Sequence, residues 1–201
     1  DGRRDLVDSD ADALASTANF LAHSGWRRGE RWGFEVRVPE GFDARGIGRG
    51  QRHPVAHWVR RGVLRIDGAP LVGHDAPTDR TAALLLPAGV EGPAFLVFRN
   101  YDAIYGYNAA ESYALAIALL SDALRGFVGP QAAWPTDDPG LSRGERRQLQ
   151  HLLAARGHEI GEIDGLIGPA TRAAIAAEQQ RLGLPVDSRA GQRLLRALRS
   201  D

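Results

Sequence analysis

Apolar positions in the first 130 residues recur at two different spacings. Leu14, Ala18 and Leu21 lie at helical spacing and are followed by Gly25, which predicts an amphipathic helix over residues 12–26. Four short apolar runs bounded by Gly, Pro or Asp follow, at residues 32–39, 62–66, 82–87 and 93–98. Runs of this kind are typical of strands, so we expect a small antiparallel sheet.

The clearest helical pattern covers residues 109–126. Its apolar stripe has members at i, i+4, i+7 and i+11, namely Tyr113, Ile117, Leu120 and Leu124. An amphipathic helix turns such a stripe toward the core, and Gly126 ends the pattern.

After an aperiodic linker at residues 129–141, the pattern becomes that of three short helices. Ser142 and Glu145 predict a capping box, and Leu149, Leu152 and Leu153 supply an apolar face. Asp164-Gly165 predicts a turn, and Pro169 suits the first position of the next helix. In the last helix the residues expected to point inward are Leu194, Leu195 and Leu198.

Composition narrows the class of protein. The formal net charge is zero, so electrostatics gives no reason to expect nucleic acid or an anionic membrane as partner. The chain has no cysteine, which excludes disulfides and thiolate metal sites, and no apolar run approaches the roughly 18 residues of a membrane span. It opens on Asp1 and contains no methionine, so we expect a processed product or a piece of a longer chain.

One segment of the C-terminal part carries a family resemblance. Residues 163–187 hold a D-G-x-x-G-P-x-T core and a helix that ends in Q-x-x-x-G-L; the matching residues are Asp164, Gly165, Gly168, Pro169, Thr171, Gln179, Gly183 and Leu184. This pattern resembles the three-helix type of peptidoglycan-binding domain. Where that family commonly has an aromatic residue, this chain has Glu178, so we expect this carboxylate to turn outward or to find a partner.

The first part resembles the membrane-bound lytic murein transglycosylase B family. The blocks that carry the resemblance are residues 1–26, 32–43, 92–124 and 134–142. It implies an α+β chain in which residues 1–128 form the C-terminal part of a lysozyme-like transglycosylase domain. Residues 129–141 are then the linker, and residues 142–199 a small three-helix bundle that binds peptidoglycan.

The same resemblance implies that Tyr107, Asn108 and Tyr113 line the groove that holds the glycan strand. A tyrosine stacks on the apolar face of a sugar, and an asparagine both donates to and accepts from N-acetyl and hydroxyl groups. A structural interpretation stands beside it: Asn108 and Glu111 have the spacing of a helix N-cap and its capping-box partner, and Tyr113 lies on the apolar stripe. Tyr101 and Tyr105, four residues apart, are expected to pack.

Enzymes of this family cut the β-1,4 bond between N-acetylmuramic acid and N-acetylglucosamine without consuming water. One glutamate acts as acid and then base, and the product is a 1,6-anhydromuropeptide. In the family that glutamate precedes all of these blocks, and Glu111 in "ESYA" comes after the Tyr-Asn pair. We therefore expect no catalytic acid in this chain and interpret Glu111 as a local look-alike.

The first residues resemble the second half of a calcium loop that some family members carry, with Asp1 and Asp12 as candidate ligands. Half a loop should hold calcium poorly, since the ion takes six to eight oxygens. An acidic helix start that includes Asp8 and Asp10 explains the same residues. We expect no required cofactor, with calcium as a structural ion only in a full-length parent.

These observations predict a fragment of a periplasmic or cell-envelope lytic transglycosylase that acts as a monomer on peptidoglycan strands. The alternative is a non-catalytic peptidoglycan-binding protein, and a hydrolase that uses Glu111 is a third interpretation. The ligand contacts of the C-terminal bundle, the wall chemotype and any lipid anchor of the parent lie beyond what these patterns determine.

Overall fold

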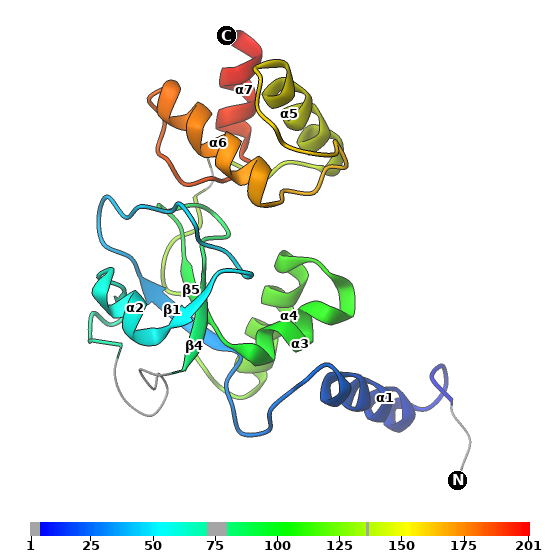
Figure 1. Cartoon of the computed structure of the whole chain (residues 1–201). Coiled ribbons are helices and arrows are strands. Elements are labelled where there is room, and N and C mark those ends of the chain that lie inside the picture. Colours follow the sequence, from blue (N-terminus) through cyan, green and yellow to red (C-terminus); the bar gives the residue numbers. More distant parts are fainter. Residues whose placement is uncertain (1–4, 72–79, 136) are drawn as a thin grey trace.

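The computed structural model describes residues 5–71, 80–135 and 137–201. Over these residues a five-stranded antiparallel sheet with flanking helices is followed by three C-terminal helices (Figure 1). The strands are β1 Gly33–Arg37, β2 Arg52–Pro54, β3 Leu64–Arg65, β4 Thr81–Leu85 and β5 Ala94–Val97. The helices are α1 Asp10–His23, α2 Val55–Arg60, α3 Arg99–Asn108, α4 Glu111–Leu124, α5 Arg143–Ala155, α6 Pro169–Arg181 and α7 Gln192–Ser200. The predicted α+β class is confirmed.

The sheet has the strand order β2-β4-β5-β1-β3, and both faces of its centre are buried. Ala82, Leu84 and Leu96 contribute to a core that includes Trp58 of α2. The alternate residues of β4 and β5 contribute to a second core under α3 and α4. Burial on both faces explains why these strands consist of continuous apolar runs. The sequence analysis missed β2 and α2, whose residues Arg52–Arg60 mix charged, imidazole and apolar side chains.

Helix α1 begins at a side-chain cap and buries little. The Asp12 backbone N–H donates to the Ser9 hydroxyl at 3.3 Å. No residue of α1 is fully buried, and Leu14 is 71 % exposed, so the predicted apolar stripe is only partly used. Leu21 packs against the core beneath α3 and α4.

The predicted apolar stripe of α4 is wrong. Ile117, Leu120 and Leu124 are 37 %, 55 % and 80 % exposed, whereas Ala114 and Ala118 are fully buried. The two alanines let α4 approach α3 and the sheet closely, and this packing faces the longer side chains outward. Helical spacing alone is compatible with burial of either face, and the tertiary contacts bury the face that carries the small alanine side chains.

Helices α5, α6 and α7 enclose a third core that includes Leu149, Leu153 and Leu195, as predicted. The capping box of Ser142 and Glu145 is present at the start of α5. A further polar contact fixes the Asp164-Gly165 turn, because Gly165 donates its backbone N–H to the buried Gln150 side chain at 2.7 Å.

Of the two alternatives predicted for Glu178, turning outward or finding a partner, the structure confirms the second. Glu178 is 4 % exposed, and its carboxylate lies 2.8 Å from both His158 Nε2 and Arg181 Nη2. Burial alone would raise the pKa of Glu178, but the hydrogen bonds of His158 and Arg181 lower it below its ordinary value. A paired carboxylate thus replaces the apolar anchor.

The linker is tied to both parts of the chain. Glu35 of β1 accepts hydrogen bonds from the backbone N–H groups of Gln131 and Ala132 at 2.7 and 2.9 Å.

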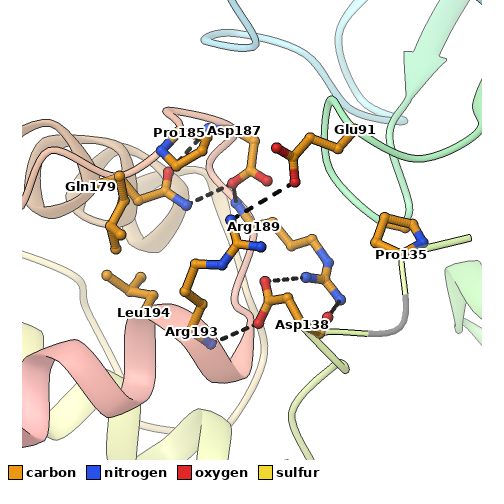
Figure 2. Close-up of a pocket in the computed structure, with 11 residues that line it drawn as sticks. Glu91, Pro135, Asp138, Gln179, Pro185, Asp187, Arg189, Arg193 and Leu194 are labelled. Atoms are coloured by element: carbon orange, nitrogen blue, oxygen red, sulfur yellow. Dashed lines mark hydrogen bonds and ion pairs between the residues drawn. The ribbon is translucent and has the colours of Figure 1, made fainter.

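Asp138, at the other end of the linker, accepts the Arg193 backbone N–H in the first turn of α7 at 2.6 Å and pairs with Arg189 at 2.5 Å (Figure 2). It therefore caps a helix whose own N-cap is a glycine, Gly191, where a Cβ would collide with the Asp138 carboxylate. The division at residues 128 and 142 stays a prediction.

We predict that Asp138→Ala lowers the free energy of unfolding by about 1–2 kcal/mol, because the first turn of α7 loses its cap and Arg189 its partner. Thermal denaturation followed by circular dichroism measures this change. Asp137→Ala is the matched control and should melt like the wild type, since the contact of Asp137 among the described residues is an exposed pair with Arg193. Equal melting of both variants with the wild type would show that the linker does not stabilise α7.

We also predict a pH-dependent contribution from the capping box. Hydrogen bonds from the Ser142 hydroxyl and backbone N–H lower the pKa of Glu145 from 4.5 to about 2. A carboxyl group whose pKa is lower in the folded state stabilises the fold at pH values above its unfolded pKa. This contribution therefore disappears as the pH falls from 4.5 to 2. Glu145→Gln retains an acceptor but does not titrate. The melting-temperature advantage of the wild type over Glu145→Gln should therefore shrink over this range; a constant difference would contradict the prediction.

Candidate functional site

The predicted groove residues lie at the junction of α3 and α4. Helix α3 ends at Asn108, and α4 begins three residues later at Glu111. Between them Ala109 has a left-handed backbone, with φ 48° and ψ 30°, and donates its N–H to the Tyr105 carbonyl at 2.7 Å. A residue with a Cβ adopts this conformation at a cost, and such residues gather at functional sites. The strained junction sets the direction in which both helix ends project.

Three aromatic rings meet at this junction. The rings of Tyr107 and Tyr113 are nearly parallel, with centroids 6.3 Å apart and an interplanar angle of 11°. Phe20 of α1 meets Tyr107 edge-on, with centroids 5.3 Å apart. Tyr107 is nevertheless 57 % exposed, and Tyr113 is half-buried. An aromatic ring that is supported from the side and open to solvent is suited to stacking on a ligand.

Asn108 is not a helix cap. It is the last residue of α3, and the N-cap position of α4 is occupied by Ala110, which provides no side-chain hydrogen bond. The capping-box interpretation of Asn108 and Glu111 is therefore wrong, because the left-handed turn at Ala109 places the N-cap of α4 at Ala110, two residues later than the spacing suggested. Asn108 is exposed at the junction beside Tyr107.

The other tyrosines and the second asparagine of this segment have structural roles. Tyr101 is fully buried and donates its hydroxyl to the Glu111 carbonyl at 2.8 Å. Tyr105 packs against the same core, with the Arg49 guanidinium 3.7 Å from its ring centroid. Asn100 is fully buried and holds the loop after α1, donating to the Arg27 and Glu30 carbonyls at 2.8 Å. Packing thus accounts for half of the tyrosines.

The C-terminal helices approach this junction. Arg172 of α6 lies 3.7 Å from the Glu111 carboxylate, and both side chains are partly exposed. The contact brings one part of the predicted peptidoglycan-binding bundle next to the tyrosine pair. Neither Arg172 nor Phe20 was singled out from the sequence, because only the folded chain brings residues so distant in sequence to the same place.

The candidate calcium loop is described only in part, so calcium binding there stays a prediction. Asp1 lies outside the described residues. The Asp12 carboxylate accepts the Asp5 backbone N–H at 2.9 Å, and Asp5 itself accepts from the backbone of Val7 and Asp8. Among the described residues no three His, Cys, Asp or Glu side chains are grouped as metal ligands. The acidic side chains here serve the start of a helix.

In combination, the junction offers an exposed ring, an amide and a nearby guanidinium–carboxylate pair. Such a surface can bind a polar ligand with apolar faces, which is the chemistry of a carbohydrate.

Comparison with protein families gives two matches. The model described as transglycosylase SLT domain matches residues 1–122, and the model described as putative peptidoglycan binding domain matches residues 142–198. Among curated proteins, a putative OxPP cycle protein OpcA from Synechococcus elongatus is 47 % identical over 55 residues, which cover 27 % of this chain and 12 % of that protein.

The solved structures that are similar to this chain include SltB3 and Slt35. SltB3 from Pseudomonas aeruginosa, in complex with NAG-anhNAM-pentapeptide, is 49 % identical with a TM-score of 0.91; the match covers 99 % of this chain and 52 % of SltB3. The Escherichia coli lytic transglycosylase Slt35 in complex with bulgecin A is 23 % identical with a TM-score of 0.51, over 62 % of this chain and 37 % of Slt35. The second likeness concerns the fold alone. This chain spans about half the length of SltB3.

We predict that Asn108→Ala weakens glycan binding about three- to tenfold, as expected for one lost hydrogen bond to the ligand. Because Asn108 caps no helix, the thermal stability of the Asn108→Ala variant should stay near that of the wild type. Titration of the chain with a soluble peptidoglycan disaccharide, together with a thermal melt, measures both. Tyr107→Phe is the companion variant, since it keeps the ring and removes only the hydroxyl. Wild-type affinity of Asn108→Ala would remove Asn108 from the groove.

Proposed function

Because the chain belongs to the transglycosylase SLT family, we propose that it is the glycan-binding portion of a lytic murein transglycosylase. The parent enzyme would cleave the MurNAc-β-1,4-GlcNAc bond of peptidoglycan non-hydrolytically and release 1,6-anhydromuropeptides. The observation that carries this proposal is the exposed ring of Tyr107, which is supported by Phe20 and by the half-buried Tyr113 within the family domain.

In this proposal Tyr107 stacks on the apolar face of a sugar ring, and Asn108 hydrogen-bonds to an N-acetyl or hydroxyl group. Tyr113 supports the ring of Tyr107 and extends the platform toward α4. The ligand class is the one that SltB3 carries in its structure, a disaccharide with an attached peptide.

We further propose that this chain by itself binds peptidoglycan without cleaving it. A glycosidase acid works from a desolvated pocket that keeps it protonated. Glu111, the glutamate at the junction, has a side chain that is 43 % exposed and paired with Arg172. Glu145 and Glu178 have lowered pKa values because of hydrogen bonds from neighbouring groups, which is the reverse of what an acid catalyst requires.

The C-terminal bundle supports binding to the cell wall, since residues 142–198 match a family described as peptidoglycan-binding. Arg172 of this bundle lies 3.7 Å from Glu111, two residues before Tyr113, so in this proposal one glycan strand contacts both parts. A periplasmic or envelope location follows from this substrate.

The proposal is tested by sedimentation with insoluble peptidoglycan and by mass spectrometry of the supernatant. We expect the chain to sediment with the polymer and to release no anhydromuropeptides. Tyr107→Ala should reduce the bound fraction several-fold, since stacking on one aromatic ring contributes about 1 kcal/mol. Phe127→Ala, which removes another exposed aromatic ring just beyond the C-terminal end of α4, is the control and should bind like the wild type.

Failure of the wild-type chain to sediment would contradict the binding proposal. Release of anhydro products would show that this chain holds its own acid. In that case Glu111→Gln identifies whether Glu111 is that acid.

A further inference from the structure

A cavity lies at the opposite end of α3 from the tyrosine pair. It has a volume of about 130 Å³ and opens between the loop after α1, β2, the start of β4 and the start of α3. A water molecule needs about 10–15 Å³ of such space, so the cavity has room for several waters. The charged residues that line it are Arg27, Arg52, Arg80, Arg99, Glu30 and Asp102.

The cations in this lining outnumber the acids by four to two. Glu30 pairs with Arg80 at 2.9 Å and with Arg27 at 3.6 Å. Asp102 pairs with Arg52 at 2.5 Å and is shared with Arg49 at 3.2 Å. Within the described residues, Arg99 makes no ion pair with a carboxylate, so the lining carries an excess of positive charge.

The pKa of Arg52 reflects both its burial and the repulsion between these neighbouring cations. Burial lowers the pKa of its guanidinium, Asp102 opposes this change, and the nearby Arg49 and Arg99 lower the pKa further. Arg99 also occupies the first turn of α3, where the helix dipole disfavours a cation. Its guanidinium is held in place against the turn after α1, 3.0 Å from where a Cβ on Gly25 would lie. A bound anion would relieve both unfavourable interactions.

We propose that this arginine pocket binds a free carboxylate of the peptide attached to the glycan strand. Guanidinium groups bind carboxylates through paired, charge-assisted hydrogen bonds. This inference rests on the proposed function, which places a sugar at Tyr107 and an attached peptide beside it.

The distances allow one ligand to reach both places. Arg99 and Tyr107 are eight residues apart on α3, a rise of about 12 Å at 1.5 Å per residue. An extended peptide of five residues spans up to about 17 Å. A peptide that leaves a sugar at the tyrosine pair can therefore run along α3 to the arginine pocket.

The test compares two soluble ligands, the NAG-anhNAM disaccharide with its pentapeptide and the same disaccharide without peptide. We expect the wild-type chain to bind the peptide-bearing ligand more tightly. In Arg99→Gln this preference should fall by roughly tenfold, the effect of losing a charged hydrogen bond, while binding of the bare disaccharide stays unchanged. Arg99 is chosen because its removal leaves none of the described carboxylates without a partner.

Arg60→Gln is the matched control, because Arg60 is an exposed arginine at the end of α2 and outside the pocket. Arg99→Lys keeps the charge but loses the planar fork, so it should show an intermediate loss. A thermal melt of each variant checks that it is folded, and the preference for the peptide should weaken with added salt.

Equal affinity of the wild type for both ligands, or an unchanged preference in Arg99→Gln, would overturn the arginine pocket and leave the proposed function standing. If the wild-type chain bound neither ligand, the proposed function itself would fail and the pocket assignment with it.

Discussion

The buried side chain of Asn100 is the contact on which the arrangement of both candidate sites depends. Its amide accepts the Arg27 N–H at 2.7 Å and donates to the carbonyls of Arg27 and Glu30 at 2.8 Å. Helix α1 has no fully buried residue, so its placement beside α3 owes little to a shared core. The side-chain amide satisfies three backbone groups that would otherwise be costly to bury. It thereby fixes the loop that carries Arg27 and Glu30.

Helix α3 connects the core to the surface chemistry. It continues directly from β5, the strand whose two faces lie in two different cores, and it begins with Arg99 at the cavity. The same helix buries Tyr101 and ends at Tyr107 and Asn108, after which Ala109 turns the chain into α4 (Figure 1). One rigid element thus sets the distance between the arginine pocket and the tyrosine pair. Rigid elements hold such groups more accurately than loops do.

Polar contacts, more than a common apolar core, join the C-terminal bundle to the first domain. Glu35 accepts hydrogen bonds from the linker backbone. Asp138 caps α7, and Arg193 of α7 lies 3.8 Å from Glu91 of the first domain (Figure 2). Partly exposed ion pairs are individually weak and are screened by salt, so the relative placement of the two parts rests on several such contacts together. Leu141, within the predicted linker, is buried in the core of the bundle. The C-terminal end of the predicted linker therefore contributes a side chain to the core of the bundle.

The sequence by itself determined those elements whose signals are local. The strands β1, β4 and β5, the capping box of Ser142 and Glu145, and the inward leucines of α5 and α7 follow from patterns that lie within one element. The Asp164-Gly165 turn and the helix start at Pro169 likewise depend on the backbone conformations that these residues themselves favour. For Glu178, the sequence predicted that the carboxylate turns outward or finds a partner, because an unpaired buried carboxylate is too costly. It did not show that Glu178 is buried or that its partners are His158 and Arg181.

Only the tertiary structure decided which face of α4 is buried, since the alanine face and the face of Ile117, Leu120 and Leu124 have equally good helical spacing. It also decided that Asn108 ends a helix instead of capping one, because that depends on the left-handed turn at Ala109. The contacts of Phe20 with Tyr107 and of Arg172 with Glu111, and the gathering of arginines around the cavity, join residues far apart in sequence. Local patterns carry no information about such contacts, because the packing of the whole chain creates them.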